Sequence, residues 1–297
     1  MALSSPLTLD ALNRMPATDF SRALAETFEY APWVAEAAAA ARPFATVTAL
    51  HEAMFSLLRA SPPDRLRAMV AGHPDLAGKA ARAGDLTADS RREQASAGLD
   101  ALSEAEYARF HALNDAYRAR FGFPFIVCVR RHGRDSILTQ FERRLRNDAA
   151  AEYATALREI FLITRLRVAA LVEGPGMPQV HGRLSTHVLD THLGRPAAGV
   201  AVELFQIAGG HPHRVLATRT NDDGRTDRPL LSGQPLPIGV WELRFAVGDH
   251  YRGRGVAGGD PPFLEIVPIR FSIAEPEGHY HVPLLCTPWS YSTYRGS

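Results

Sequence analysis

The chain has 297 residues, which exceeds an average domain of ~100–200 residues and predicts two domains. Its formal net charge of +1 and its charged fraction of 22% exclude a strong electrostatic footprint for nucleic acid or for a membrane surface. Because no apolar run approaches the ~18 residues of a membrane-spanning helix, no secretory signal is recognisable and only Cys128 and Cys286 are present, we expect a cytoplasmic protein without a disulfide framework.

The first half of the chain, residues 1–172, has the apolar spacing of helices. One helix is expected over 50–58, and the pair Pro62-Pro63 that follows stops it. A second begins at the capping box formed by Ser103 and Glu106 and continues to a glycine. A stretch rich in alanine, arginine and leucine, 143–172, closes this half. The pattern predicts an all-α domain.

Three short motifs in this half carry residue types suited to chemistry. They are H-P-D-L-A-G-K from His73, S-x-x-E-Q from Ser90, and the apolar run F-G-F-P-F-I-V-C-V around Ile126. Each also has a simpler interpretation. His73 and Pro74 suit a turn, Ser90 and Glu93 suit an N-cap with its capping-box partner, and the apolar run suits a core.

A segment rich in glycine and proline, 173–178, predicts a linker, and after it the hydrophobic period changes to two. Alternating strands are expected over 184–190, 200–205 and 241–247, separated by turn signals. Several short strands with regular turns predict an antiparallel β-sandwich over 179–297.

Histidines gather in this second half. His279 and His281 are two apart on an expected strand and therefore point to one face, while His187 lies on another strand. Arg225 follows an Asn-Asp-Asp-Gly turn. Two imidazoles and a guanidinium can activate water and polarise a carbonyl. From these residues alone, structural histidines and a zinc site at His279 and His281 remain open alternatives.

Three segments of the second half resemble a known enzyme family. They are L-S-T-H-V-L-D-T-H-L-G-R-P-A-A-G-V (184–200), N-D-D-G-R (221–225) and H-Y-H-V-P-L-L-C-T-P-W-S-Y-S-T-Y-R-G-S (279–297). They are similar to the transthyretin-related 5-hydroxyisourate hydrolases, and the closing Tyr-Arg-Gly-Ser is the part that separates these enzymes from transthyretin.

This resemblance implies a transthyretin-like fold and hydrolytic opening of 5-hydroxyisourate without a metal. The product would be 2-oxo-4-hydroxy-4-carboxy-5-ureidoimidazoline, abbreviated OHCU. The resemblance implies catalytic roles for His187, Arg225, His281 and Ser297, and a substrate contact for Tyr294.

The three motifs of the first half, taken together and in this order, resemble the decarboxylases that act on OHCU. The resemblance spans about residues 7–171. It implies loss of carbon dioxide without a cofactor, because an adjacent imine and carbonyl in the substrate can accept the electron pair. It assigns catalysis to His73 and Glu93, and substrate binding to Pro74, Ser90, Ile126 and Arg167, with Arg165 as a competitor for the last position.

The product of the expected hydrolase is the substrate of the expected decarboxylase, so the chain as a whole resembles the bifunctional allantoin synthases. This implies small-molecule substrates, no cofactor, and no nucleic-acid or membrane partner. It also implies a homo-oligomer, a tetramer through the sandwich with dimer contacts through the helical domain. Two alternatives are a transthyretin-like binding module joined to a helical interaction domain, and a metal-dependent hydrolase of a related cyclic amide.

Overall fold

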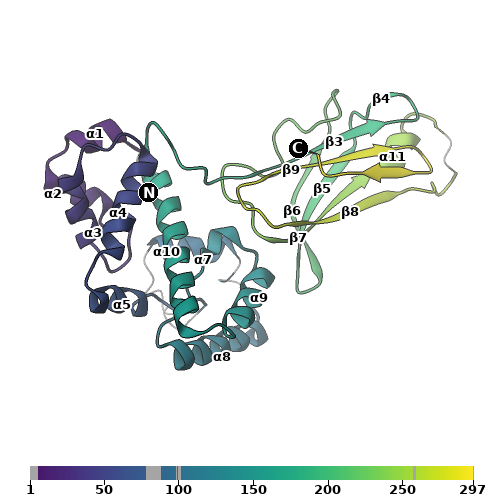
Figure 1. Ribbon diagram of the computed structural model, residues 1–297. Helices are drawn as coiled ribbons and strands as arrows, with labels where there is room; N and C mark the ends of the chain where they lie inside the picture. Colours follow the sequence, from purple (N-terminus) through teal and green to yellow (C-terminus); the bar gives the residue numbers. More distant parts are fainter. Residues whose placement is uncertain (1–5, 78–87, 98, 100–101, 257–258, 297) are drawn as a thin grey trace. The chain divides into compact units, whose positions relative to one another are not determined.

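The computed structural model of the chain separates into two compact units (Figure 1). The helical unit comprises residues 1–129 and 137–180, and the sheet unit comprises residues 130–136 and 181–297. The residues that the structure describes are 6–77, 88–97, 99, 102–256 and 259–296.

Successive helices with short connections build the helical unit. Their bounds are α1 Leu9–Arg14, α2 Ala17–Leu24, α3 Trp33–Ala38, α4 Val47–Arg59, α5 Pro63–Ala71, α7 Ala88–Ser96, α8 Glu104–Phe121, α9 Arg134–Arg144 and α10 Ala149–Leu171. The capping box before α8 is confirmed, since the Glu106 N–H donates to Ser103 Oγ (3.3 Å) and the Ser103 N–H donates to Glu106 Oε2 (2.9 Å). Gly122 ends α8 with a φ of 75°, a left-handed conformation that glycine adopts without a steric penalty. The predicted all-helical character of this half is therefore observed over its described residues, apart from a two-residue strand at each end.

A buried ion pair supports the apolar run that the sequence marks around Ile126. Arg144, whose side chain is 2% exposed, contacts the fully buried Glu152 at 2.5 Å. The same guanidinium donates to the carbonyl oxygen of Ile126 (2.8 Å) and lies over the ring of Phe125. Because a buried charge is costly unless it is paired, this arrangement holds the backbone of the run in one place.

The two short strands join the start and the end of the helical unit. β1 (Leu7–Thr8) pairs in parallel with β2 (Val172–Glu173). Beyond β2 the chain stays attached, because the N–H of Val47 donates to the Pro175 carbonyl (3.0 Å) and that of Thr48 to the Gly176 carbonyl (3.1 Å). Much of the segment expected to be a linker thus contacts the helical unit.

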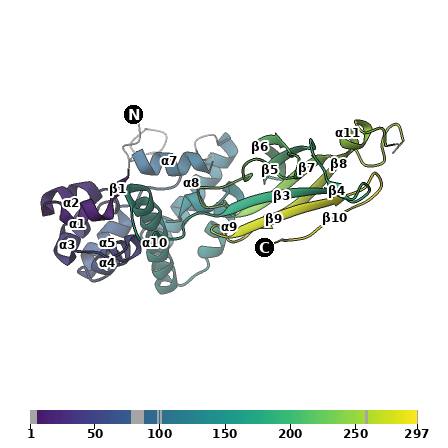
Figure 2. The same ribbon diagram turned by 90° about the horizontal axis from the view of Figure 1, so that it is seen from above.

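Two four-stranded sheets make up the sheet unit, in the orders β10-β9-β3-β4 and β6-β5-β7-β8. The strands are β3 Arg183–Asp190, β4 Arg195–Pro196, β5 Ala201–Ala208, β6 His211–Arg219, β7 Gly239–Ala246, β8 Ile266–Ile273, β9 His279–Cys286 and β10 Tyr291–Thr293. The expectation of wholly antiparallel sheets is wrong at one pair, because β3 and β9 run parallel, side by side in Figure 2. These strands are distant in the sequence, and a parallel pair needs such a long connection.

The side chains that point inward from both sheets form one apolar cluster. It includes Leu184 and Val188 of β3, Leu243 of β7 and Leu284 of β9. Because successive side chains of a strand alternate, the residues between them on β3 and β9 face away from this cluster. That outward face carries the histidines identified in the sequence.

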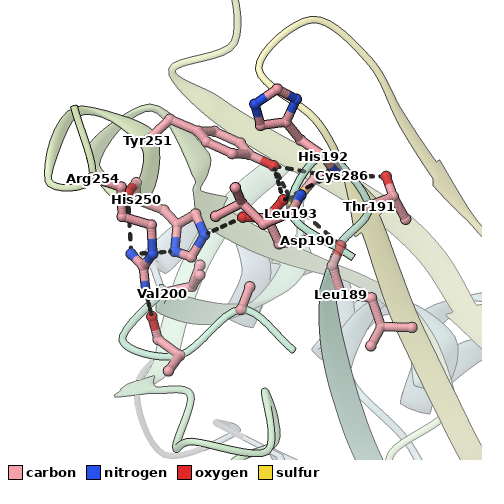
Figure 3. A network of polar contacts seen from close by, with 12 residues as sticks. Leu189, Asp190, Thr191, His192, Leu193, Val200, His250, Tyr251, Arg254 and Cys286 are labelled. Atoms are coloured by element: carbon pink, nitrogen blue, oxygen red, sulfur yellow. Dashed lines mark hydrogen bonds and ion pairs between the residues drawn. The ribbon is translucent and has the colours of Figure 1, made fainter. Parts of the chain in front are cut away.

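A network of polar contacts ties the helix α11 (Val247–Arg252) to the ends of β3 and β9 (Figure 3). Asp190 Oδ2 lies 3.1 Å from His250 Nε2, and the Tyr251 hydroxyl donates to Asp190 Oδ1 (3.0 Å) and to the Cys286 carbonyl (2.9 Å). Burial raises the pKa of the Asp190 carboxyl, but hydrogen bonds from the Leu193 N–H, His250 and Tyr251 outweigh it and hold that pKa below its ordinary value.

Cys128 is buried in the helical unit and Cys286 in the sheet unit, and they form no disulfide with each other. None of the helices in the described part of the chain has the length and apolar character needed to span a membrane.

Candidate active sites

The outward face of β3 and β9 borders a cavity of about 240 Å³ in the sheet unit. The parallel register places Arg183 beside His279 and Ser185 beside His281. The segment after the Asn-Asp-Asp-Gly turn runs beside β3 and also lines the cavity. The polar residues that line the cavity include Arg183, Ser185, Arg225, Asp227, Arg228, His279 and His281. The two strand histidines therefore share one face, as their spacing predicts.

His281 is held by a hydroxyl that the sequence interpretation missed. Ser185 Oγ lies 3.0 Å from His281 Nδ1 and 3.4 Å from His279 Nε2. Burial lowers the pKa of His281, and the positive charge of Arg225 lowers it further. A neutral imidazole near pH 7 can accept a proton from water. Alternation along β3 puts Ser185 on the face of His187, but its pairing with His281 depends on a register that the sequence does not reveal.

The Asn-Asp-Asp-Gly turn carries Arg225 to His187. Gly224 lies in the left-handed region with a φ of 71°, and a Cβ there would stand 2.3 Å from the Val188 carbonyl oxygen. That close approach allows the Val188 N–H to donate to the Gly224 carbonyl (2.8 Å), and His187 and Arg225 then form a β-bridge. Asn221 closes the turn by accepting from the Arg225 N–H (3.1 Å).

Burial followed by the charge of Arg225 lowers the pKa of His187, while the backbone of Asp223 opposes the shift. His187 Nε2 is buried and has no hydrogen-bond partner among the described residues. His187 lies beside Arg225 and not on the lining of the cavity itself. A buried, unpartnered imidazole nitrogen is costly and therefore suits a group that meets a ligand.

The end of the chain passes over His281. The Gly296 N–H donates to the His281 carbonyl (2.9 Å), and a Cβ at Gly296 would stand 2.6 Å from the His281 ring. Tyr294 is exposed, at 59%, and the Arg295 guanidinium lies 4.7 Å from the centre of the Tyr280 ring. Ser297 lies outside the described residues.

The helical unit contains a smaller cavity, of about 40 Å³, lined by the segment that follows α5, by α7 and α10 and by the apolar run. It brings together all six residues that the sequence assigns to this half. The six are His73, Pro74, Ser90, Glu93, Ile126 and Arg167. Glu29, from the connection between α2 and α3, also lines this cavity and was not identified from the sequence, because no motif surrounds it.

Arg167 is the arginine of α10 that faces this cavity. It is buried and donates to both carboxylate oxygens of Glu93, at 3.1 Å from Nε and 2.8 Å from an Nη. A planar guanidinium suits such a two-point contact. Arg165 is half-buried, does not line the cavity, and acts electrostatically on His51 instead.

The capping-box interpretation of Ser90 and Glu93 is wrong. Ser90 lies inside the described helix α7, Ala88–Ser96, and not before it. Ser90 Oγ donates to Glu29 Oε1 (2.5 Å), and the Glu93 carboxylate contacts Arg167. Both side chains therefore make tertiary contacts with distant parts of the chain.

His73 is the titratable ring of this cavity. Its Nδ1 donates to the Met69 carbonyl (2.9 Å), and its Nε2 lies 4.0 Å from Glu29 Oε2. Burial lowers the pKa of His73, the Met69 carbonyl and the negative charge of Glu29 raise it, and the positive charge of Arg167 lowers it. The ring is therefore neutral near pH 7.

Residues 13–169 match the family described as OHCU decarboxylase, and residues 184–296 match the HIUase/transthyretin family. A 5-hydroxyisourate hydrolase from Ralstonia nicotianae is 54% identical over 116 residues, 39% of this chain and 99% of that relative. A 2-oxo-4-hydroxy-4-carboxy-5-ureidoimidazoline decarboxylase from Haloferax volcanii is 39% identical over 163 residues, 55% of this chain and 95% of that relative. A crystal structure of an (S)-allantoin synthase is similar over 98% of this chain and 100% of its own, with 32% identity and a TM-score of 0.51.

Proposed function

Because this chain belongs to the OHCU decarboxylase family over residues 13–169 and to the HIUase/transthyretin family over residues 184–296, we propose that it is a bifunctional enzyme of urate degradation. The sheet unit hydrolyses 5-hydroxyisourate to OHCU, and the helical unit decarboxylates OHCU to (S)-allantoin. The observation that carries the proposal is the similarity to an (S)-allantoin synthase, which extends over both units at 32% identity. The product of one unit is thus the substrate of the other.

For the first reaction, the proposal gives the two imidazoles the task of activating water. His187 and His281 both have a lowered pKa, so each is a proton acceptor at neutral pH. Arg225 polarises the attacked carbonyl of the six-membered ring. Cleavage of the ring amide releases a carboxylate, and Arg183 and Arg228 on the same cavity favour that charge. Ser297 and Tyr294 remain proposed contributors to catalysis and substrate contact.

For the second reaction, the proposal needs no cofactor, because the substrate provides its own electron sink. The electron pair of the broken carbon–carbon bond is delocalised into the ring and onto the imine nitrogen. Arg167 binds the carboxylate or the delocalised anion, with Glu93 fixing its orientation. His73 moves the proton that completes the product, and Pro74, Ser90 and Ile126 border the substrate.

A homo-oligomer is part of the proposal, as a tetramer through the sheet unit with dimer contacts through the helical unit. Large apolar side chains exposed on the sheet unit support it, among them Ile266, Trp289 and Tyr291. We also keep a cytoplasmic location as part of the proposal. A mass measurement in solution tests the assembly, and a monomer would contradict it.

The direct test supplies 5-hydroxyisourate freshly generated from urate by urate oxidase and follows circular dichroism. We expect (S)-allantoin to accumulate much faster than in the absence of the protein. Racemic allantoin appearing at the spontaneous rate would contradict decarboxylation. Persistence of 5-hydroxyisourate at its spontaneous rate of decay would contradict hydrolysis and favour a binding module.

A further inference from the structure

Glu29 is a buried carboxylate on a strained turn. Its side chain is 7% exposed, although it belongs to a surface connection between two helices. The next residue, Tyr30, has a φ of 58°, a left-handed conformation that strains a residue with a Cβ. Phe28 before it is 2% exposed and Tyr30 after it is 57% exposed. The turn therefore directs Glu29 inward between a core anchor and a surface residue.

The two oxygens of Glu29 have different neighbours. Oε1 accepts from the Ser90 hydroxyl at 2.5 Å and lies 3.4 Å from an Nη of Arg167. Oε2 lies 4.0 Å from Nε2 of His73. Ser90 and Arg167 thus fix the carboxylate on one side while its other side faces the imidazole.

The protonation state of His73 follows from its other nitrogen. The Met69 carbonyl can only accept a hydrogen bond, so Nδ1 carries the proton of the neutral ring. Nε2 then has a lone pair and no proton to give. A ring in this state can serve decarboxylation only by first taking up a proton, which makes it a buried cation. Such a cation needs a counter-charge nearby.

Tyr30 meets the edge of this ring at 6.4 Å between ring centres. Within the described part of the chain, three charged groups line the cavity together with His73, from different elements. They are Glu29 before α3, Glu93 on α7 and Arg167 on α10. Arg167 disfavours an imidazolium, and Glu93 is held by both of its oxygens to Arg167. Glu29 places a carboxylate oxygen 4.0 Å from Nε2. The geometry leaves the counter-charge to Glu29.

We propose that Glu29 is a positioning residue for decarboxylation, whose carboxylate stabilises the imidazolium formed when His73 Nε2 takes up the substrate's proton. This rests on the proposed decarboxylase function. Carbon dioxide leaves, its bonding pair forms a carbon–carbon double bond, and the imine pair moves to the ring nitrogen, which takes a proton from water. The substrate hydroxyl then gives its proton to Nε2 and becomes the carbonyl, and Nε2 returns a proton to the neighbouring carbon. One proton is consumed overall.

The test compares the wild-type chain with Glu29→Gln, which keeps an oxygen for Ser90 and removes the charge. We expect kcat for decarboxylation to fall about 100-fold, within the usual range of an acid–base contribution. The acid limb of kcat/KM should move to lower pH, because loss of a negative charge lowers the pKa of His73. Ring opening by the Glu29→Gln chain should keep its wild-type rate. The control Glu36→Gln, at an exposed site, should keep wild-type values for both activities.

An acid limb that stays in place would overturn the proposal, even with a reduced kcat, because a purely structural role would not move it. If Glu29→Gln fails to fold, Glu29→Asp replaces it. The shorter side chain of aspartate moves the negative charge away from His73 Nε2 by the length of one methylene. The acid limb of kcat/KM should therefore move to lower pH, but by less than in Glu29→Gln. An acid limb that does not move overturns the proposal.

The titration of His73, followed by NMR with labelled histidine, separates this idea from the proposed function. A wild-type chain that does not decarboxylate OHCU would contradict the function. In that case the His73 signal should still titrate at lower pH in Glu29→Gln than in the wild type. Identical titrations would contradict the coupling alone.

Discussion

The two cavities hold similar groups but compensate their charges differently. In the helical unit one guanidinium, Arg167, contacts two carboxylates, those of Glu29 and Glu93. In the sheet unit the described residues that line a larger cavity include three arginines and one acid, Asp227. In the first site the guanidinium is already paired with carboxylates, so a substrate must compete for contacts that already exist. The second has surplus positive charge and can receive an anion directly.

The histidines of the two sites also differ in the hydrogen-bond partners of their ring nitrogens. His73 has a hydrogen-bond acceptor at one nitrogen and a carboxylate facing the other. His187 has a buried Nε2 that lacks a hydrogen-bond partner in the described part of the chain. In the helical site, groups of the protein therefore interact with both ring nitrogens of the histidine. In the sheet site, a ligand or a covering surface must supply the hydrogen-bond partner of His187 Nε2.

The largest expected effect separates the two sites outright. His73→Asn keeps an N–H for the Met69 carbonyl and removes Nε2, so decarboxylation should fall by ~10²–10⁴-fold. Ring opening should continue, and OHCU should accumulate and be visible by its absorbance. The surface variant His111→Asn serves as control. Loss of both activities together would contradict independent action of the two units.

The next effect tests the positive charge of the sheet site. Arg225→Gln should reduce ring opening by ~10²–10³-fold, as for other lost groups that stabilise developing charge. In the wild type, burial and then Arg225 hold the pKa values of His187 and His281 below 6.5, so the acid limb of kcat/KM lies below that pH. Removing a positive charge raises both pKa values, and the limb should move to higher pH. A limb that moved to lower pH would be incompatible with this account, and Arg195→Gln is the exposed control.

A smaller effect examines the passage of the chain over His281. Gly296→Ala adds a Cβ that would stand 2.6 Å from the His281 ring, so the ring or the tail must shift. We expect a loss in ring opening on the order of 10-fold, since misplacing a catalytic group by about 1 Å is costly. Decarboxylation should be unchanged. Gly194→Ala, where a Cβ meets nothing within 4 Å, is the matched control, although its φ of 67° adds strain. Wild-type hydrolysis in Gly296→Ala would mean that the tail lies elsewhere in solution.

The smallest effect concerns stability and not chemistry. Tyr251→Phe removes a hydroxyl that donates to Asp190 and to the Cys286 carbonyl, and should lower the free energy of unfolding of the sheet unit by about 1–3 kcal/mol. The pKa of Asp190 is held below 3.8 in the folded state, so its contribution to stability is complete above that pH and is lost as the pH falls through the lowered value. Tyr251→Phe raises the pKa of Asp190, so acid unfolding should begin at higher pH. Thermal melts over a pH series measure this, with Tyr291→Phe as control. A pH midpoint of acid unfolding that is the same in Tyr251→Phe and in the wild type would contradict the prediction.

Local patterns in the sequence predicted those features that depend on residues close together in the chain. The capping box predicted the start of α8, and the spacing of His279 and His281 predicted their common face, because both depend on neighbours in the chain. The partners of Ser90 and Glu93 were not predictable in this way. Their spacing fits a helix cap, but contacts with Glu29 and Arg167, from distant parts of the chain, decide where they point. The parallel register of β3 and β9 and the role of Ser185 depend likewise on tertiary structure.

The pairing of β1 with β2 determines where the chain can be divided. Leu7 lies opposite Val172, so a segment near the start of the helical unit pairs with one near its end. A cut directly after Val172 would release Pro175 and Gly176 from the N–H groups of Val47 and Thr48. Val180 is still buried with Cys128 and Leu166. A separately expressed decarboxylase should therefore extend to Val180. With its two ends adjacent, the same unit is also suited to circular permutation or to insertion into a loop of another protein.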